Sequence, residues 1–152
     1  MALHDAEQGT AGRDEGRGER GRKRMKSWRK AILWGLAVWL VPFVIALAAF
    51  SLKESWRSLF ESIMALSVAL ITVIASARYL RATGPATWEA GARLGLLWFA
   101  ISVLIDLPLM LSPPINYTLM EYAADIGLTY GMIPVITTGM ALAASQLSKS
   151  RS

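Results

Sequence analysis

The chain has 152 residues, of which 54% are hydrophobic and only 18% are charged, and its formal net charge is +5. A soluble domain usually carries charge on about a quarter of its residues, so this composition favours a one-domain membrane protein. The chain has no cysteine and a single histidine, His4. These counts exclude disulfides, thiolate metal sites, a cysteine nucleophile and a histidine-based catalytic pair within one chain.

Residues 1–27 are rich in Gly, Arg, Glu and Asp and nearly free of apolar side chains, which is typical of a disordered tail. Nine of the sixteen Lys and Arg residues lie between Arg13 and Lys30. We interpret this basic stretch as a topology signal that stays in the cytoplasm and contacts anionic lipid headgroups. Nucleic acid is not expected as a partner.

Four apolar segments follow, at about 31–50, 59–80, 88–111 and 119–147, and residues 148–152 form a second short tail. Each segment is long enough to cross a hydrocarbon core about 30 Å thick as a helix. Short connections between them favour antiparallel neighbours. The sequence therefore predicts an all-α, transmembrane, up-down-up-down four-helix bundle (residues 28–147) with a disordered basic N-terminal tail. An alternative stays open for the first segment, because Ala46-Leu47-Ala48 also fits a signal-peptide cleavage site.

The basic residues give this bundle an orientation. With the N-terminus inside, only Lys53 and Arg57 face outward, whereas the basic tail, the 81–87 loop region and the C-terminal residues face inward. This asymmetry follows the positive-inside rule. We expect a multi-pass protein of the inner cell membrane with both termini cytoplasmic.

Carboxylates near the outer end are the strongest functional lead in the sequence. Asp106 lies five residues before the end of the third segment, roughly 7 Å deep at the helical rise per residue. Charged groups at such positions usually face the bundle interior and carry function. The candidate intramembrane polar or ion site comprises Asp106, Asp125, Glu61, Tyr122 and Thr129. If the fourth span begins at Ile126 rather than Leu119, Asp125 is interfacial, and the sequence does not choose between these registers.

A purely structural interpretation of the same groups is also open. Asp106 can accept hydrogen bonds from a Tyr or Trp side chain, and Arg57 and Glu61 are spaced to pair on one helix face. Small residues predict close helix packing in three places. These are the Gly91-xxx-Gly95 pair, the row Ala65, Ala69, Val73 and Ala77, and the row Gly127, Gly131, Val135, Gly139 and Ala143.

The segments DIGLTYGMIPVITTG (residues 125–139), DLPLM (106–110) and WLVPF (39–43) carry a resemblance. Over residues 28–144 the chain resembles a group of small uncharacterised prokaryotic four-helix integral membrane proteins. The resemblance implies the fold and implies no activity, since none is established for that group.

We therefore predict an integral membrane protein without enzymatic chemistry: a small transporter or ion- or proton-binding unit that uses the outer-leaflet carboxylates. The alternative is a structural or accessory subunit of a larger membrane complex, and an intramembrane lipid or peptide enzyme is less supported because no motif indicates one. No catalytic residue, metal ligand or cofactor is predicted. The expected partners are the lipid bilayer and either a second copy of the chain or a larger complex.

Overall fold

The computed structural model describes residues 28–83, 87–113 and 115–150. The predicted tail at residues 1–27 and the last two residues lie outside this described part, and so do the side chains of Glu54, Asp125 and Lys149. The described residues form helices joined by short turns and contain no strand. Four helices are long and apolar enough to cross a membrane, at Trp28–Ala48, Arg57–Thr83, Trp88–Leu111 and Leu128–Ser148. This confirms the prediction of an all-helical fold with four long apolar helices.

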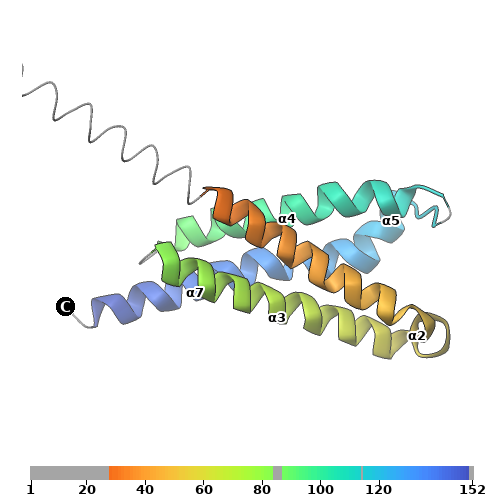
Figure 1. The fold of residues 1–152 in the computed structure, drawn as a ribbon, viewed down its shortest axis with the longest axis horizontal. Coiled ribbons are helices and arrows are strands. Elements are labelled where there is room, and N and C mark those ends of the chain that lie inside the picture. Colours follow the sequence, from red (N-terminus) through yellow and green to blue (C-terminus); the bar gives the residue numbers. More distant parts are fainter. Residues whose placement is uncertain (1–27, 84–86, 114, 151–152) are drawn as a thin grey trace, which may run out of the picture.

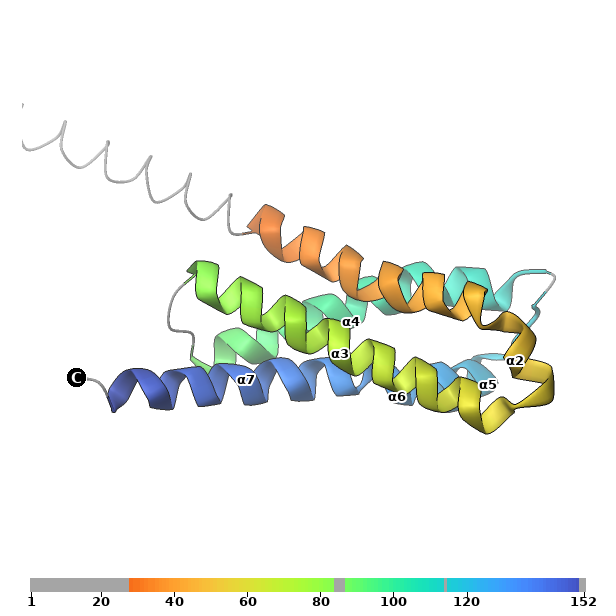
Figure 2. The ribbon, with the colours of Figure 1, turned by 60° about the horizontal axis from the view of Figure 1, so that its bottom comes forward.

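The elements after the first helix (Trp28–Ala48) are α2 (Phe50–Ser55), α3 (Arg57–Thr83) and α4 (Trp88–Leu111). They continue with α5 (Leu119–Tyr122), the π-helix η1 (Ala123–Gly127), α6 (Leu128–Tyr130) and α7 (Met132–Lys149). The helices pack into an elongated bundle, and α2 lies at the same end as α5 (Figures 1 and 2). Most of the short connection expected between segments 31–50 and 59–80 thus forms α2, which contains Leu, Lys and Glu and neither Gly nor Pro.

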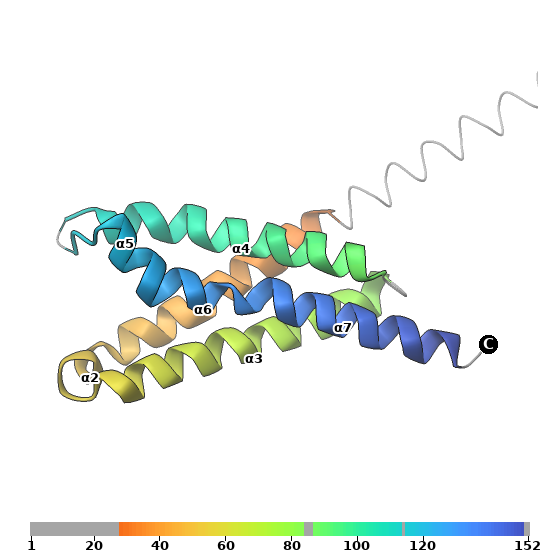
Figure 3. The ribbon, with the colours of Figure 1, turned by 180° about the vertical axis from the view of Figure 1, so that it is seen from behind.

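Close approach between α4 and α7 depends on the Gly91-xxx-Gly95 pair. A Cβ atom at Gly91 would lie 2.5 Å from the Ala141 Cβ, and one at Gly95 would collide with the Thr137 Oγ1. The two helices cross in direct contact along this face (Figure 3). The pair therefore acts as the small-residue packing face that the sequence predicts.

The other glycine row, on α7 and the segments before it, does not pack into the bundle. Val135 is 72% exposed, and a Cβ at Gly139 would meet no atom within 4 Å. The prediction that this row is a packing face within the chain is therefore wrong. The helix instead buries Ile133, Thr137 and Ala141, the positions that follow the same spacing on its opposite side.

Trp98 anchors the first helix to the rest of the bundle. Its side chain is fully buried, and its indole N–H donates to the Ala31 carbonyl oxygen at 2.8 Å. Tyr79 of α3 meets the Trp98 ring edge-on, with centroids 6.4 Å apart. A hydrophobic core runs through these contacts and comprises Ala31, Val38, Val68, Ala75, Leu94, Trp98, Tyr130 and Ile133.

A loop of turn residues joins α4 to α5 at the end where α2 also lies. The Tyr117 N–H donates to the Met110 carbonyl oxygen at 2.9 Å, which folds the loop back over the end of α4. Asn116 has a φ of 52°, in the left-handed region that Asn tolerates better than most residues. This fold-back places Tyr117 beside α2.

Candidate functional site

A cavity of about 150 Å³ opens near the end of the bundle formed by α2, α5 and the 112–118 loop. The face of α3 that borders it has helical spacing, with Arg57 and Glu61 toward the helix start and Met64 and Val68 further in. Its apolar walls are Phe43, Ala46, Phe60, Met64, Val68, Met110 and Ile126. Its polar groups are Lys53, Arg57, Glu61, Asp106, Tyr117, Thr129 and Tyr130.

Asp106 is the buried acid of this cavity, with only 3% of its surface exposed. The Tyr130 hydroxyl donates to its Oδ2 at 3.3 Å. The buried indole N–H of Trp39 faces the carboxylate but does not reach hydrogen-bond geometry with it or with any other described group. Among the described side chains, the one ion pair joins Arg57 to Glu61, so no cation neutralises Asp106.

The structure thus brings Asp106 together with a tyrosine, as the structural interpretation of the sequence predicts. A single 3.3 Å hydrogen bond is long for an O–H donor to a carboxylate. An ionised carboxylate has about four lone-pair sites, so most of its accepting capacity is unused by protein donors. Asp106 also lines the cavity, so a ligand bound there could use this capacity.

Lys53 is the cation at the mouth of the cavity, carried there by α2. Its ammonium donates to the Tyr117 hydroxyl at 3.0 Å and lies 5.3 Å from the centre of the Tyr117 ring. No described carboxylate pairs with it. The contact with the aromatic ring holds the ammonium in place without neutralising its charge.

Glu61 lines the same cavity, but its charge is already compensated. The Arg57 guanidinium donates to its Oε1 at 2.8 Å, and both side chains are more than half exposed. The i, i+4 pairing predicted from the sequence is therefore confirmed. Glu61 belongs to the solvent-exposed rim, whereas Asp106 belongs to the buried end.

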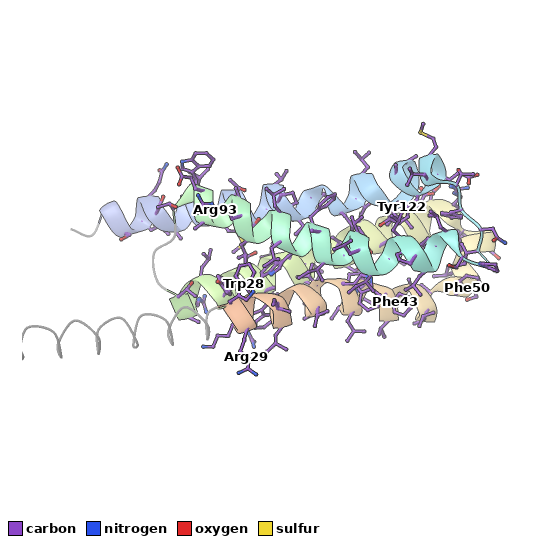
Figure 4. All side chains as sticks on the ribbon, turned by 90° about the horizontal axis from the view of Figure 1, so that it is seen from above. Trp28, Arg29, Phe43, Phe50, Arg93 and Tyr122 are labelled. Atoms are coloured by element: carbon purple, nitrogen blue, oxygen red, sulfur yellow. The ribbon has the colours of Figure 1, made fainter. Side chains whose placement is uncertain are left out.

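Thr129, Tyr122 and Asp125 complete the predicted set. Thr129 lines the cavity. Tyr122 lies outside the cavity lining in the same half of the bundle as Phe43 (Figure 4), with its hydroxyl buried and without a described partner. Burial and, secondarily, the Asp106 charge raise the pKa of Tyr122 to about 12, so the phenol stays neutral. The Asp125 backbone lies in η1, and its side chain lies outside the described part of the structure.

The helix that carries Tyr122, Thr129 and Tyr130 is irregular where it borders the site. Residues 123–127 form a π-helical turn, and α6 ends at Tyr130, four residues before Pro134. Proline lacks a backbone N–H and clashes with the preceding turn, which accounts for the interruption. Single π-helical turns inside α-helices are frequent at functional sites, because they change which side chains face inward.

The sequence interpretation missed Lys53, Tyr117 and Phe60 as lining residues. Phe60 is spaced i, i+4 before Met64, another lining residue of α3, so helical spacing could have found it. Lys53 and Tyr117 are 64 residues apart in the sequence and meet only through the folding of two connections. No local pattern identifies such a contact.

The described residues contain no group of three His, Cys, Asp or Glu side chains that could hold a metal ion. Comparison of the chain with protein-family models, with curated protein sequences and with solved structures found no match. The resemblance noted from residues 39–43, 106–110 and 125–139 therefore stays an expectation. The function has to be argued from the geometry of this cavity.

Proposed function

We propose that the chain is an integral membrane protein whose four long helices run up-down-up-down, with both termini cytoplasmic and the cavity near the outer surface. The exposed exterior of the bundle supports insertion. Leu104 of α4, Leu128 of α6 and Val135 of α7 are each more than 70% exposed. Soluble monomers rarely expose such large apolar areas, whereas a lipid-facing surface requires them.

The proposed function is the binding of a positively charged group at Asp106, entered from the outer side, as the recognition step of a small transporter or binding unit. The single observation that carries this proposal is the Asp106 carboxylate itself. It is buried, bonded by one long tyrosine contact, unpaired by any described cation and placed on a cavity wall.

Electrostatics explains why such a carboxylate needs a cationic partner. Removing an ion from water costs several kcal/mol, and in proteins this cost is offset by a counter-ion or by several hydrogen bonds. Asp106 has neither within the described part of the chain. A proton or a bound cation supplies the missing partner, and the cavity supplies its route.

A binding experiment on the full chain in lipid nanodiscs tests this function. 3-Methylbutylamine serves as the probe, because it combines an ammonium with an apolar body that suits walls such as Phe43, Phe60 and Met110. We expect calorimetric binding to the native chain and at least a tenfold loss in Asp106→Asn, which keeps the size of the side chain. Glu89→Gln removes an exposed carboxylate from the opposite end of α4 and is expected to bind as the native chain does. Equal amine binding by the native chain and Asp106→Asn contradicts the proposal.

An accessory subunit of a membrane complex is the second candidate. The observation that favours it is the exposed small-residue face of α7, where Gly139 has open space beside it. This candidate predicts a stably copurifying membrane protein whose retention is lost in Gly139→Leu and unaffected by Asp106→Asn. The cation-binding proposal predicts instead that binding of the amine probe is lost in Asp106→Asn and unaffected by Gly139→Leu.

A further inference from the structure

The cavity holds two uncompensated charges of opposite sign. Among the described side chains, Asp106 is a carboxylate without a cation and Lys53 is an ammonium without a carboxylate. The one charged pair on the wall, Arg57 with Glu61, is neutral by itself. A ligand that carries only a positive charge satisfies Asp106 and leaves Lys53 uncompensated on the same cavity. A ligand that carries only a negative charge pairs with Lys53 and leaves Asp106 uncompensated.

The two charges lie at different depths. Asp106 is five residues before the end of α4, which is roughly 7 Å along the helix axis. Lys53 lies in α2, at the end of the bundle, and its ammonium is held against Tyr117 in the loop that follows α4. The positive group of a ligand therefore belongs inside, and its negative group belongs at the mouth.

The size and walls of the cavity define the rest of the ligand. A volume of about 150 Å³ is comparable to cavities that accommodate a benzene molecule. The apolar part of the cavity wall includes Phe43, Phe60, Met64 and Met110. A small ligand with a short hydrocarbon part fits this space, and a bare inorganic ion leaves the apolar wall unused.

We propose that the cavity binds a small zwitterion, with its ammonium at Asp106, its anionic group at Lys53 and its hydrocarbon part against the apolar wall. This inference rests on the proposed function, since it adds an anion-binding group to the cation site. The same chemistry occurs in a free aliphatic amino acid and in the headgroup of an aminophospholipid. Both sources present an ammonium and an anionic oxygen a few ångströms apart.

Three probes of one carbon skeleton separate the charges. L-Leucine carries both, 3-methylbutylamine carries only the ammonium, and 4-methylpentanoate carries only the carboxylate. With the full chain in phosphatidylcholine nanodiscs, we expect leucine to bind at least tenfold more tightly than either singly charged probe. In a second arm, native mass spectrometry measures retention of phosphatidylethanolamine against phosphatidylglycerol, and a preference that depends on both Lys53 and Asp106 identifies a lipid source.

Variants assign the anion site. Lys53→Met is expected to reduce the preference for leucine over the amine to about one, whereas Lys53→Arg retains the charge and the preference. Tyr117→Phe keeps the ring and the Lys53 charge but removes the hydroxyl that accepts from Lys53. If Lys53→Met retains the preference for leucine, Lys53 is not the anion site, whatever Tyr117→Phe does. Glu89→Gln serves as the matched surface control.

The outcomes distinguish the two proposals. If the amine binds through Asp106 but leucine and phosphatidylethanolamine gain nothing from Lys53, the zwitterion inference is wrong and the cation site stands. If binding of the amine and binding of the zwitterion are both independent of Asp106, the proposed function is wrong as well. A Lys53-dependent and Asp106-dependent preference for leucine or for phosphatidylethanolamine supports both.

Discussion

The Tyr130 hydroxyl donates to the Asp106 carboxylate across 3.3 Å, and this contact joins α6 to α4 inside the bundle. Both side chains are buried. The distance exceeds the usual O–H···O range, so the tyrosine orients the carboxylate without saturating it. Asp106 is therefore held in a defined position on the cavity wall, with accepting capacity that this one hydrogen bond does not fill.

Tyr130→Phe tests that contact without changing the ring. We expect the free energy of unfolding to fall by about 1–3 kcal/mol, because a buried carboxylate loses its hydroxyl donor. The measurement is a dodecyl sulfate unfolding titration in mixed micelles. In an Asp106→Leu background the same change should cost distinctly less, since the acceptor is gone. Equal costs in the two backgrounds would show that the tyrosine hydroxyl does not act through Asp106.

Trp98→Phe tests the anchor of the first helix. The substitution removes the indole N–H that donates to the Ala31 carbonyl oxygen at 2.8 Å and leaves a cavity at a fully buried position. Lost hydrogen bonding and lost packing together predict a decrease of about 2–4 kcal/mol in the free energy of unfolding. Trp88→Phe is the matched control, since Trp88 is in the same helix and 55% exposed. Similar losses in both variants contradict the anchor role.

Gly95→Ala tests the close approach of α4 and α7. The added methyl group would collide with Thr137 and lie 2.5 Å from the Pro134 Cα, which is backbone and cannot move alone. Overpacking of this kind costs about 1–3 kcal/mol or more and forces the helices apart. Gly139→Ala adds the same methyl group where nothing lies within 4 Å, so no loss of stability is expected. Thermal unfolding of the two variants in detergent distinguishes them.

The start of α5 provides a test that depends on pH. The Glu121 carboxylate accepts hydrogen bonds from the Thr118 N–H and hydroxyl, both at 2.8 Å, and these bonds lower the pKa of Glu121 from its ordinary value of 4.5. The stabilisation from these hydrogen bonds is fully present when the pH is above the ordinary pKa of 4.5. It is lost as the pH falls through the lowered pKa of Glu121. The amides of residues 119–122 should therefore become more protected against hydrogen exchange as the pH rises above the lowered pKa of Glu121. The measured rates are first corrected for the intrinsic dependence of exchange on pH.

Thr118→Ala should reduce the same protection at neutral pH, because the helix loses its N-cap side chain, which is worth about 1 kcal/mol. Thr87→Ala, the corresponding change at the N-cap of α4, leaves the α5 amides untouched and serves as the control. Unchanged exchange at residues 119–122 in Thr118→Ala contradicts the capping role.

The long helices and the buried acid were predictable, because both follow from local sequence. Runs of apolar residues predict the four long helices, and an aspartate five residues inside such a run is expected to face the interior. The Arg57–Glu61 pair also follows from its spacing. These features depend on neighbours within one or two helical turns.

The buried faces were less predictable, because helices that contact lipid are apolar on every side. On α3 the buried residues are Ser67, Val68, Thr72, Ala75 and Ser76, rather than the alanine row at 65, 69, 73 and 77. Thr72 lies inside because its hydroxyl donates to the Val68 carbonyl oxygen and so carries no unpaired group. The π-helical turn at 123–127 and the Lys53–Tyr117 contact depend on tertiary packing, which no local pattern encodes.

Both proposals require that Asp106 is reached from the outer side. Because the chain contains no cysteine, a single introduced cysteine can measure this access directly. A single Asp106→Cys substitution in the full chain, reconstituted with known orientation, is exposed to a membrane-impermeant trimethylammonium thiosulfonate on one side at a time. Ser102→Cys, one turn deeper and fully buried, and Leu104→Cys, on the exposed apolar face, are the controls. We predict labelling of Asp106→Cys from the side of Lys53 and not of either control. Absence of labelling at position 106, or labelling only from the opposite side, would contradict access to Asp106 from the outer side.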